Sequence, residues 1–238
     1  MAAIFSHESA ILTHSTGDTM KADLHIHSHF SYDAIAKPET ILQVAAERQI
    51  EFIAITDYDS TLSWQQFEQL APYYPVNVIK GQEIKLFNGK YIDGEILALF
   101  LQKPIKSTTM EEIIEDVKAQ GGLISIAHPF CDRRGEFRAF DQIDDWSHIA
   151  IEAKNGRIYK PRDNEMARGL ADMMNLPVTA GSDAHTPFEI GSVYVEFDGA
   201  SAIDLKNAIL NRDVYIGGES ASAFFSLVSH FGRLGISI

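Results

Sequence analysis

Twelve residues near the start of the chain, DLHIHSHFSYDA at positions 23–34, contain three histidines and two aspartates. His25 and His27 are separated by one residue. In a β-strand this spacing places both imidazoles on one face, where they could chelate one metal ion. Asp33 follows in a turn-like Ser-Tyr-Asp-Ala segment. Taken alone, the stretch is explained equally well by one packed and one solvated imidazole and a solvated turn aspartate.

Acids and imidazoles also end later segments that look like strands. Asp57 could ligate a metal, hold a ligand imidazole in its tautomer, or cap the next turn. Glu83 lies among apolar residues, where a buried carboxylate needs a partner such as a metal ion. His128 ends an apolar segment that Pro129 stops. Asp183 and His185 repeat the alternate spacing of the first two histidines.

Glu95 becomes a candidate ligand through a predicted hairpin. Asn88-Gly89 is typical of a hairpin turn. A three-residue loop at positions 88–90 would pair Glu83 with Glu95, and two facing carboxylates repel unless a cation lies between them. The alternative for Glu95 is a solvated glutamate on an edge strand.

Arginines near these positions predict recognition of an anion. Arg133 and Arg134 follow His128 in the same loop, and a guanidinium can bind phosphate through two hydrogen bonds. Arg157 follows another apolar segment, in which Glu152 and Asn155 are further candidates for orienting ligands or substrate. A solvated loop is the alternative for the arginine pair.

Strand and helix patterns alternate along the chain. Segments rich in β-branched residues predict strands at 22–27, 51–57, 76–84, 95–101, 123–128, 148–154 and 177–182. Periodicity and caps predict helices at 38–49, 63–71, 108–120, 161–175 and 201–211. This alternation favours a parallel-rich α/β fold. In an α/β barrel the strands end on one face, so the scattered acids and imidazoles are expected to form one cluster.

Size and charge narrow the class of protein. The chain has 238 residues and no recognisable linker, so we interpret residues 1–19 as an N-terminal extension and 20–238 as a single domain. A net charge of −13 disfavours nucleic acid as a partner. No apolar run is long enough to cross a membrane, and no secretory signal is recognisable. The single cysteine, Cys131, suits a cytoplasmic location and is interpreted as a packed residue.

The motifs DLHIHS, ITDYDS, GQEI, IAHPF and GSDAH, in that order, resemble those of the polymerase and histidinol phosphatase (PHP) superfamily. The resemblance covers residues 21–190. It implies a distorted seven-stranded (β/α) TIM-like barrel. It also implies a phosphoesterase activity that depends on two to three divalent ions, with zinc, manganese and iron as the candidates.

The resemblance implies a set of metal ligands as well. They are His25, His27, Asp33, Glu83, Glu95, His128, Asp183 and His185. Glu83 would bridge two ions, and Glu95 stands where the family has a histidine, although a carboxylate is also a competent ligand. Tyr58 stands at another family histidine, beside Asp33 and His185, and a neutral tyrosine is a poor ligand for the third ion that the family can hold there.

These observations predict a hydrolase that uses metal-activated water on a small phosphorylated metabolite or nucleotide. Arg133, Arg134 and Arg157 would bind the phosphate. Asp57 or His185 would orient water or protonate the leaving oxygen. The alternatives are a 3′–5′ exonuclease or editing domain, a non-catalytic module with a weakened metal site, and an amidohydrolase-type enzyme. The sequence leaves the oligomeric state open.

Overall fold

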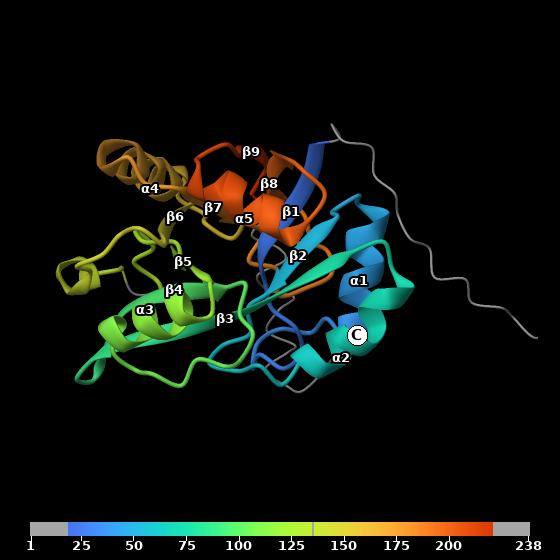
Figure 1. Cartoon of the computed structure of the whole chain (residues 1–238), viewed down its shortest axis with the longest axis horizontal. Helices are drawn as coiled ribbons and strands as arrows, with labels where there is room; N and C mark the ends of the chain where they lie inside the picture. The colour runs from blue at the N-terminus through green and yellow to red at the C-terminus, as the bar shows by residue number, and fades with distance from the viewer. Residues whose placement is uncertain (1–18, 135, 221–238) are drawn as a thin grey trace, which may run out of the picture.

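The computed structural model describes residues 19–134 and 136–220 (Figure 1). The predicted N-terminal extension, apart from Thr19, and the apolar segment 221–238 lie outside the described residues. The prediction that residues 20–238 form one domain therefore stays a prediction. Among the described residues, no helix is both long and apolar enough to cross a membrane.

The described chain contains one mixed sheet. Its strands are β1 (Thr19–Ile26), β2 (Phe52–Ile55), β3 (Asn77–Asn88), β4 (Tyr91–Leu99), β5 (Leu123–Ile126), β6 (Ile149–Asn155), β7 (Val178–Gly181), β8 (Val193–Asp198) and β9 (Tyr215–Gly218). Their order in the sheet is β7-β6-β5-β4-β3-β2-β1-β8-β9. β3 and β4 form an antiparallel hairpin, and β4 also runs antiparallel to β5.

The sheet is a nearly closed barrel. The backbone N–H of His27, just after β1, donates to the carbonyl of Ala184, just after β7, at 2.9 Å. A parallel bridge between Ile26 and Ala184 continues this contact. The first and seventh strands are thus joined at one end, while β8 and β9 extend the sheet on the other side of β1.

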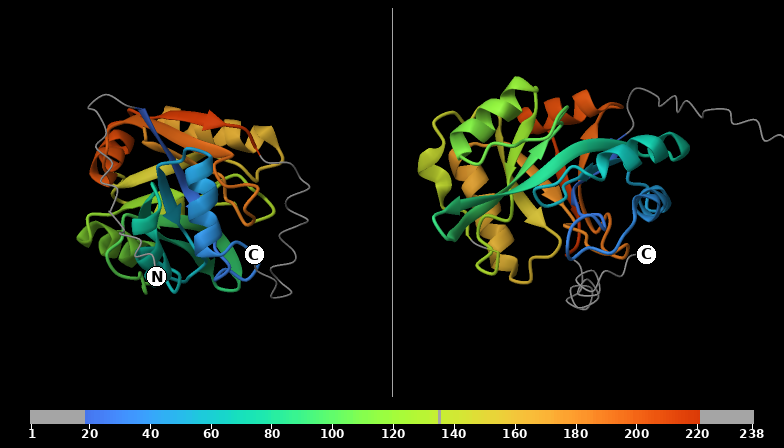
Figure 2. Two further views of the ribbon diagram at one scale, coloured as in Figure 1. Left: turned by 90° about the vertical axis from the view of Figure 1, so that its right-hand side faces the viewer. Right: turned by 90° about the horizontal axis from the view of Figure 1, so that it is seen from below.

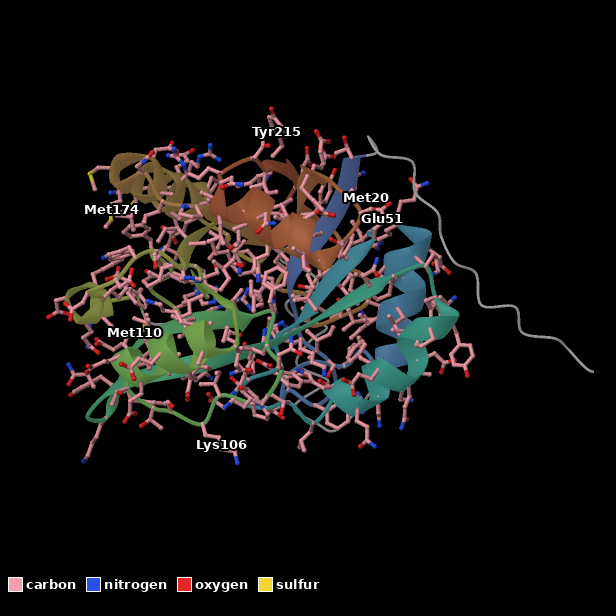
Figure 3. The ribbon with its side chains drawn as sticks, in the orientation of Figure 1. Met20, Glu51, Lys106, Met110, Met174 and Tyr215 are labelled. Carbon is pink, nitrogen blue, oxygen red and sulfur yellow. The ribbon has the colours of Figure 1, made fainter. Side chains whose placement is uncertain are left out.

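The prediction of an α/β fold with a barrel-shaped sheet is confirmed, although the sheet is mixed rather than mainly parallel, and the expected count of seven strands is wrong because the described sheet has nine. The missed β8 has the sequence VYVEFD, in which Val193, Val195 and Phe197 are buried and the residues between them are more exposed. This alternation is typical of a half-exposed strand. The missed β9 is only four residues long, and Tyr215 in it points away from the molecule (Figure 3).

The five predicted helices are confirmed, with ends within two residues of the prediction. They are α1 (Pro38–Glu47), α2 (Trp64–Leu70), α3 (Met110–Ala119), α4 (Pro161–Met174) and α5 (Ala202–Leu210), with short 3-10 turns at Ala71–Tyr73 and Ala139–Gln142. Thr109 caps α3 by accepting from the N–H of Glu112, and Ser201 with Asp204 forms a capping box on α5.

The hairpin of β3 and β4 contains the two longest strands of the described sheet and runs across the molecule (Figure 2). Its tip is exposed, with Phe87 60% and Tyr91 78% accessible. The opposite end of β4 packs into the barrel, where Leu97 and Leu99 join a buried apolar cluster. Because β4 is antiparallel to its neighbours, its first residues lie at the edge where the parallel strands end.

Candidate metal centre

Four strands bring these polar side chains together. His25 lies at the end of β1 and His27 just after it, Glu83 lies in β3, His128 follows β5, and Asp183 follows β7. We call these five residues the central cluster. All five side chains are buried. The structure thus brings together ligand candidates that are distant in the sequence.

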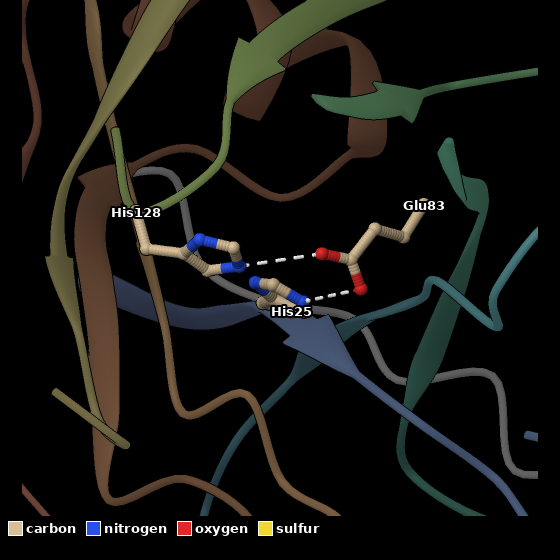
Figure 4. Close-up of side chains that lie close together, drawn as sticks. All are labelled: His25, Glu83 and His128. Atoms are coloured by element: carbon tan, nitrogen blue, oxygen red, sulfur yellow. Dashed lines mark hydrogen bonds and ion pairs between the residues drawn. The ribbon is translucent and has the colours of Figure 1, made fainter. Parts of the chain in front are cut away.

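Glu83 lies between two imidazoles (Figure 4). Its Oε2 is 3.2 Å from Nε2 of His25, and its Oε1 is 3.3 Å from Nε2 of His128. One ligand atom from each of these residues lies within 4.8 Å of the others. Imidazole nitrogens and a carboxylate at this spacing can hold a divalent transition metal.

A second group of ligand atoms shares His25. Nε2 of His25 lies 3.2 Å from Nε2 of His27, and Oδ1 of Asp183 lies 3.6 Å and 3.5 Å from these two nitrogens. Oδ1 of Asp183 is buried and has no hydrogen-bond partner among the described residues. A buried carboxylate oxygen facing imidazole nitrogens fits a bound cation, which would satisfy them all.

Hydrogen bonds at the Nδ1 atoms, on the side away from the cluster, orient the imidazoles of His25 and His27. Nδ1 of His25 lies 2.8 Å from Oε1 of Glu152, and Nδ1 of His27 lies 3.0 Å from Oγ of Ser31. Because the Ser31 hydroxyl already donates to Asp57, it accepts from Nδ1–H of His27. The Nε2 atoms of both rings then face the cluster. This is how proteins commonly fix histidines that ligate metals.

Glu152 supports two ligands at once. Besides contacting His25, it accepts from the backbone N–H of His128 at 2.8 Å and from Nδ2 of Asn155 at 3.1 Å. Sequence reasoning named Glu152 only among residues that could orient ligands or substrate. The stronger signal was an acid inside a strand whose neighbours are all apolar and buried, since such an acid needs polar partners.

Asp57 holds the loops behind His27. Its carboxylate accepts from the N–H and hydroxyl of Ser28 and from the hydroxyls of Ser31 and Ser63, at 2.5–2.8 Å. These donors tie the loop after β1 to the start of α2. Through Ser31, Asp57 also fixes the ring of His27. Asp57 thus contacts His27 through Ser31 and not directly, and its role stays a prediction.

The predicted pairing of Glu83 with Glu95 is wrong. Leu97 lies opposite Glu83, and Lys85 lies opposite Glu95. The turn is tighter than predicted, since Asn88 pairs with Tyr91, and an irregularity between Leu86 and Phe87 shifts the register. Glu83 and Glu95 are therefore diagonal neighbours on one face of the hairpin. Glu95 still reaches the centre, because its Oε2 lies 3.4 Å from Nε2 of His128.

The pKa values in the centre reflect crowded, buried charges. Burial and the neighbouring Glu83 raise the pKa of Glu95 to about 8, although Lys85, 3.7 Å away, acts in the opposite direction. Burial alone would lower the pKa of His25, but the carboxylates of Glu152 and Glu83 raise it to about 10. A divalent cation would replace the protons that these groups hold.

Asp33, Tyr58 and His185 lie beside the central cluster and form what we call the tyrosine side. Nε2 of His185 is 3.2 Å from Oδ1 of Asp33 and 3.2 Å from the hydroxyl of Tyr58. Burial raises the pKa of Tyr58 well above its usual value, so the phenol is neutral. A neutral phenol is a poor metal ligand, so this side offers only two good ones.

The three arginine candidates lie in different places. Arg134 forms an ion pair with Asp183 of the central cluster. Arg157 is buried, with its Nε 3.2 Å from Oε1 of Glu189. Arg133 lies over the ring of Tyr159, 5.7 Å from its centre, so the structure does not bring it to the cluster.

The backbone at the site is strained. His128 has a φ of 28° and Asp183 a φ of 55°, in a region that non-glycine residues rarely adopt. Each such residue costs about 1–3 kcal/mol, and such strain collects at functional sites. A Cβ at Gly181 would lie 2.5 Å from the backbone nitrogen of His25, so only glycine permits this approach of β7 to β1.

Comparison with known families settles the classification. Residues 23–160 match the model of the PHP domain, and residues 161–214 match that of the PHP-associated region. This chain belongs to the PHP family. The implied superfamily resemblance is thereby confirmed.

Individual PHP relatives agree with this assignment. Uncharacterized protein MJ1587 of Methanocaldococcus jannaschii is 38% identical over 136 residues, which are 51% of this chain and 76% of that protein. Uncharacterized protein MJ0417 of the same organism is 29% identical over 75% of this chain and 70% of its own length. A crystal structure of a two-domain Bacteroides vulgatus protein, described as containing a predicted PHP-like metal-dependent phosphoesterase, superposes with a TM-score of 0.69. It is 20% identical, and the match covers 98% of this chain and 75% of that one, which supports the fold.

Proposed function

We propose that this PHP protein is a metal-dependent phosphoesterase that hydrolyses a small phosphorylated metabolite or nucleotide. The observation that carries the proposal is the convergence of Nε2 of His25, Nε2 of His27 and Oδ1 of Asp183, all buried and facing one another. Together with the PHP assignment, this convergence supports a divalent metal centre.

The central cluster, together with Glu95, would hold two ions. His25, His27 and Asp183 would hold one, and His128 with Glu95 the other, while Glu83 reaches both groups. Mixed imidazole and carboxylate ligands suit zinc, manganese and iron. When bound, such ions polarise phosphate oxygens and lower the pKa of a coordinated water to about 7.

The surrounding residues would bind and orient the substrate. Arg134, with a side chain 21% exposed, lies where it can contact a phosphate oxygen. The neutral Tyr58 hydroxyl can donate a hydrogen bond. Burial, Arg157 and His27 lower the pKa of His185 well below its usual value, so its neutral ring orients water as an acceptor. Asp57 supports His27 from behind.

Charge favours a small substrate over a polymer. The net charge of −13 repels an extended nucleic acid, whereas a small phosphoester can be bound by the few cations at the centre. The cytoplasmic location expected from the single cysteine stays a prediction.

The test combines metal analysis with an activity screen of the full-length chain. After loading with manganese, iron or zinc, we expect about two ions per chain and phosphate release from some members of a panel of phosphomonoesters and diesters. A chelator should abolish the release. Absence of both bound metal and phosphate release would refute the proposal. Labelled single-stranded DNA belongs in the same panel, because its degradation would favour the exonuclease alternative.

A further inference from the structure

We propose that Arg134 is a built-in competitor for the metal site: its guanidinium and a metal ion share the carboxylate of Asp183, so metal loading releases Arg134 toward the substrate. The inference rests on the proposed function, because it requires a divalent ion at His25, His27 and Asp183. It adds a coupling between metal binding and anion binding through one side chain.

The two oxygens of Asp183 have different surroundings. Oδ1 faces the imidazoles of His25 and His27 and has no hydrogen-bond partner among the described residues. Oδ2 pairs with the guanidinium of Arg134 and accepts from Nδ2 of Asn155 at 3.1 Å. A metal ion on Oδ1 and Arg134 on Oδ2 would therefore share one buried negative charge.

Electrostatics makes this sharing unfavourable. A guanidinium stays protonated in proteins, so it cannot relieve the repulsion by losing a proton. Arg134 also lies in the field of the carboxylates of Glu83 and Glu95, which a second ion would neutralise. As metal ions neutralise these carboxylates, Arg134 loses attraction and gains repulsion. The effect is strong because Asp183, Glu83 and Glu95 are all buried.

The loop allows Arg134 to move without unfolding. The N–H of Cys131 donates to His128, the N–H of Phe137 to Pro129 and the N–H of Arg138 to Asp93, at 2.9–3.0 Å, so the backbone is anchored on both sides. The Arg134 side chain, at 21% exposure, already reaches the surface. A rotation of this side chain suffices to move the guanidinium from Asp183 to an incoming anion.

Thermodynamic reciprocity defines the test. If Arg134 weakens metal binding by some factor, the metal weakens the Arg134–Asp183 pair by the same factor. Manganese is titrated by calorimetry into the chelator-treated full-length chain. Arg134→Gln removes the charge but keeps a polar side chain. We expect this variant to bind the first, more tightly held manganese ion about tenfold more strongly than the wild type does. The control is Arg133→Gln, which makes the same charge change at the neighbouring residue. Because Arg133 lies over the ring of Tyr159, this variant should leave the affinity for manganese unchanged.

The possible results are distinguishable. A wild type that takes up none of manganese, zinc and iron in such titrations, and releases no phosphate, would refute the proposed function. A wild type that binds manganese while Arg134→Gln binds it equally or less tightly would overturn only the inference.

A second measurement uses the wild type alone, in case the variant does not fold. The rate at which phenylglyoxal modifies each arginine is followed by mass spectrometry with and without manganese. We expect the rate at Arg134 to rise on metal loading while that at Arg133 stays constant. An unchanged or slower reaction at Arg134 would contradict the release of its guanidinium.

Discussion

The central cluster and the tyrosine side lie next to each other and share the same edge of the barrel, yet they differ in what they can bind. In the central cluster, carboxylates face imidazoles, and the Nδ1 atoms of His25 and His27 are held by Glu152 and Ser31. On the tyrosine side, Asp33 and His185 meet a neutral phenol. Proximity of acids and histidines is common to both. The two sites differ in the number of good ligands, which is larger in the central cluster. We therefore expect metal ions in the central cluster and none on the tyrosine side.

The largest effect is expected when a ligand of the central cluster is removed. His25 would hold the first ion with His27 and Asp183 and also lies next to Glu83, so His25→Ala should lose at least the first ion and lower the phosphatase activity by about 1000-fold or more. Metal content per folded chain and turnover are the measurements. His148→Ala is the control, because His148 contacts the carbonyl of Gly122 outside the centre. Retention of two ions in His25→Ala would contradict the role of His25 as a metal ligand in the central cluster.

A smaller effect is expected from the residue that holds His25 in place. Glu152→Gln keeps the shape but removes the charge that accepts from Nδ1 of His25. Loss of such an orienting carboxylate typically weakens metal binding about 10- to 100-fold. Manganese titration measures it, with the exposed Glu165→Gln on α4 as the control. Equal affinity in both variants would mean that Glu152 has no role in orienting the ligand.

The two sides also differ in how pH affects stability. Glu95 has a folded pKa of about 8 and His25 one of about 10, both above their ordinary values. Between about pH 6.5 and 8 the folded, chelator-treated protein thus binds more protons than the unfolded chain, so its stability falls as pH rises. The pKa values of Asp33 and His185 are lowered, which confines their contributions to pH values below about 6.5.

Urea unfolding of chelator-treated protein measures this difference. We expect the free energy of unfolding to drop by about 3 kcal/mol between pH 6.5 and pH 8, with Glu95 and His25 contributing about equally. Glu95→Gln should reduce the drop, because it removes one of the titrating groups. A stability that rises over this range would show that these groups do not hold their protons.

The smallest effects are expected at Tyr58. Tyr58→Phe removes one hydrogen bond to His185 and should change turnover by less than about tenfold, since one hydrogen bond contributes about 1 kcal/mol. Tyr58→His adds a third good ligand beside Asp33 and His185. We expect it to bind one more manganese ion per chain than the wild type. If the wild type already binds three, the tyrosine side is not the weaker one.

The sequence predicted most of what local patterns can encode. The first seven strands and five helices follow from periodicity and caps, and the ligand candidates follow from their positions at strand ends. β8 was missed although its alternation indicates a strand, β9 is only four residues long, and both lie beyond the last motif. The register of the β3–β4 hairpin depends on the irregularity between Leu86 and Phe87, which no turn signal reveals.

Other features of the site depend on tertiary structure alone. Arg133 and Arg134 are adjacent and identical in type, yet only Arg134 reaches the cluster. Which of them does so is set by the path of the loop. Lys85 was not singled out, because its contact with Glu95 arises only in the observed register.

The most direct test of the metal centre is anomalous scattering from crystals of the full-length protein grown with manganese and measured at the manganese edge. Two peaks are predicted, one among His25, His27 and Asp183 and the other between Glu83 and His128. Well-ordered density for these side chains without an anomalous peak among them would contradict the account.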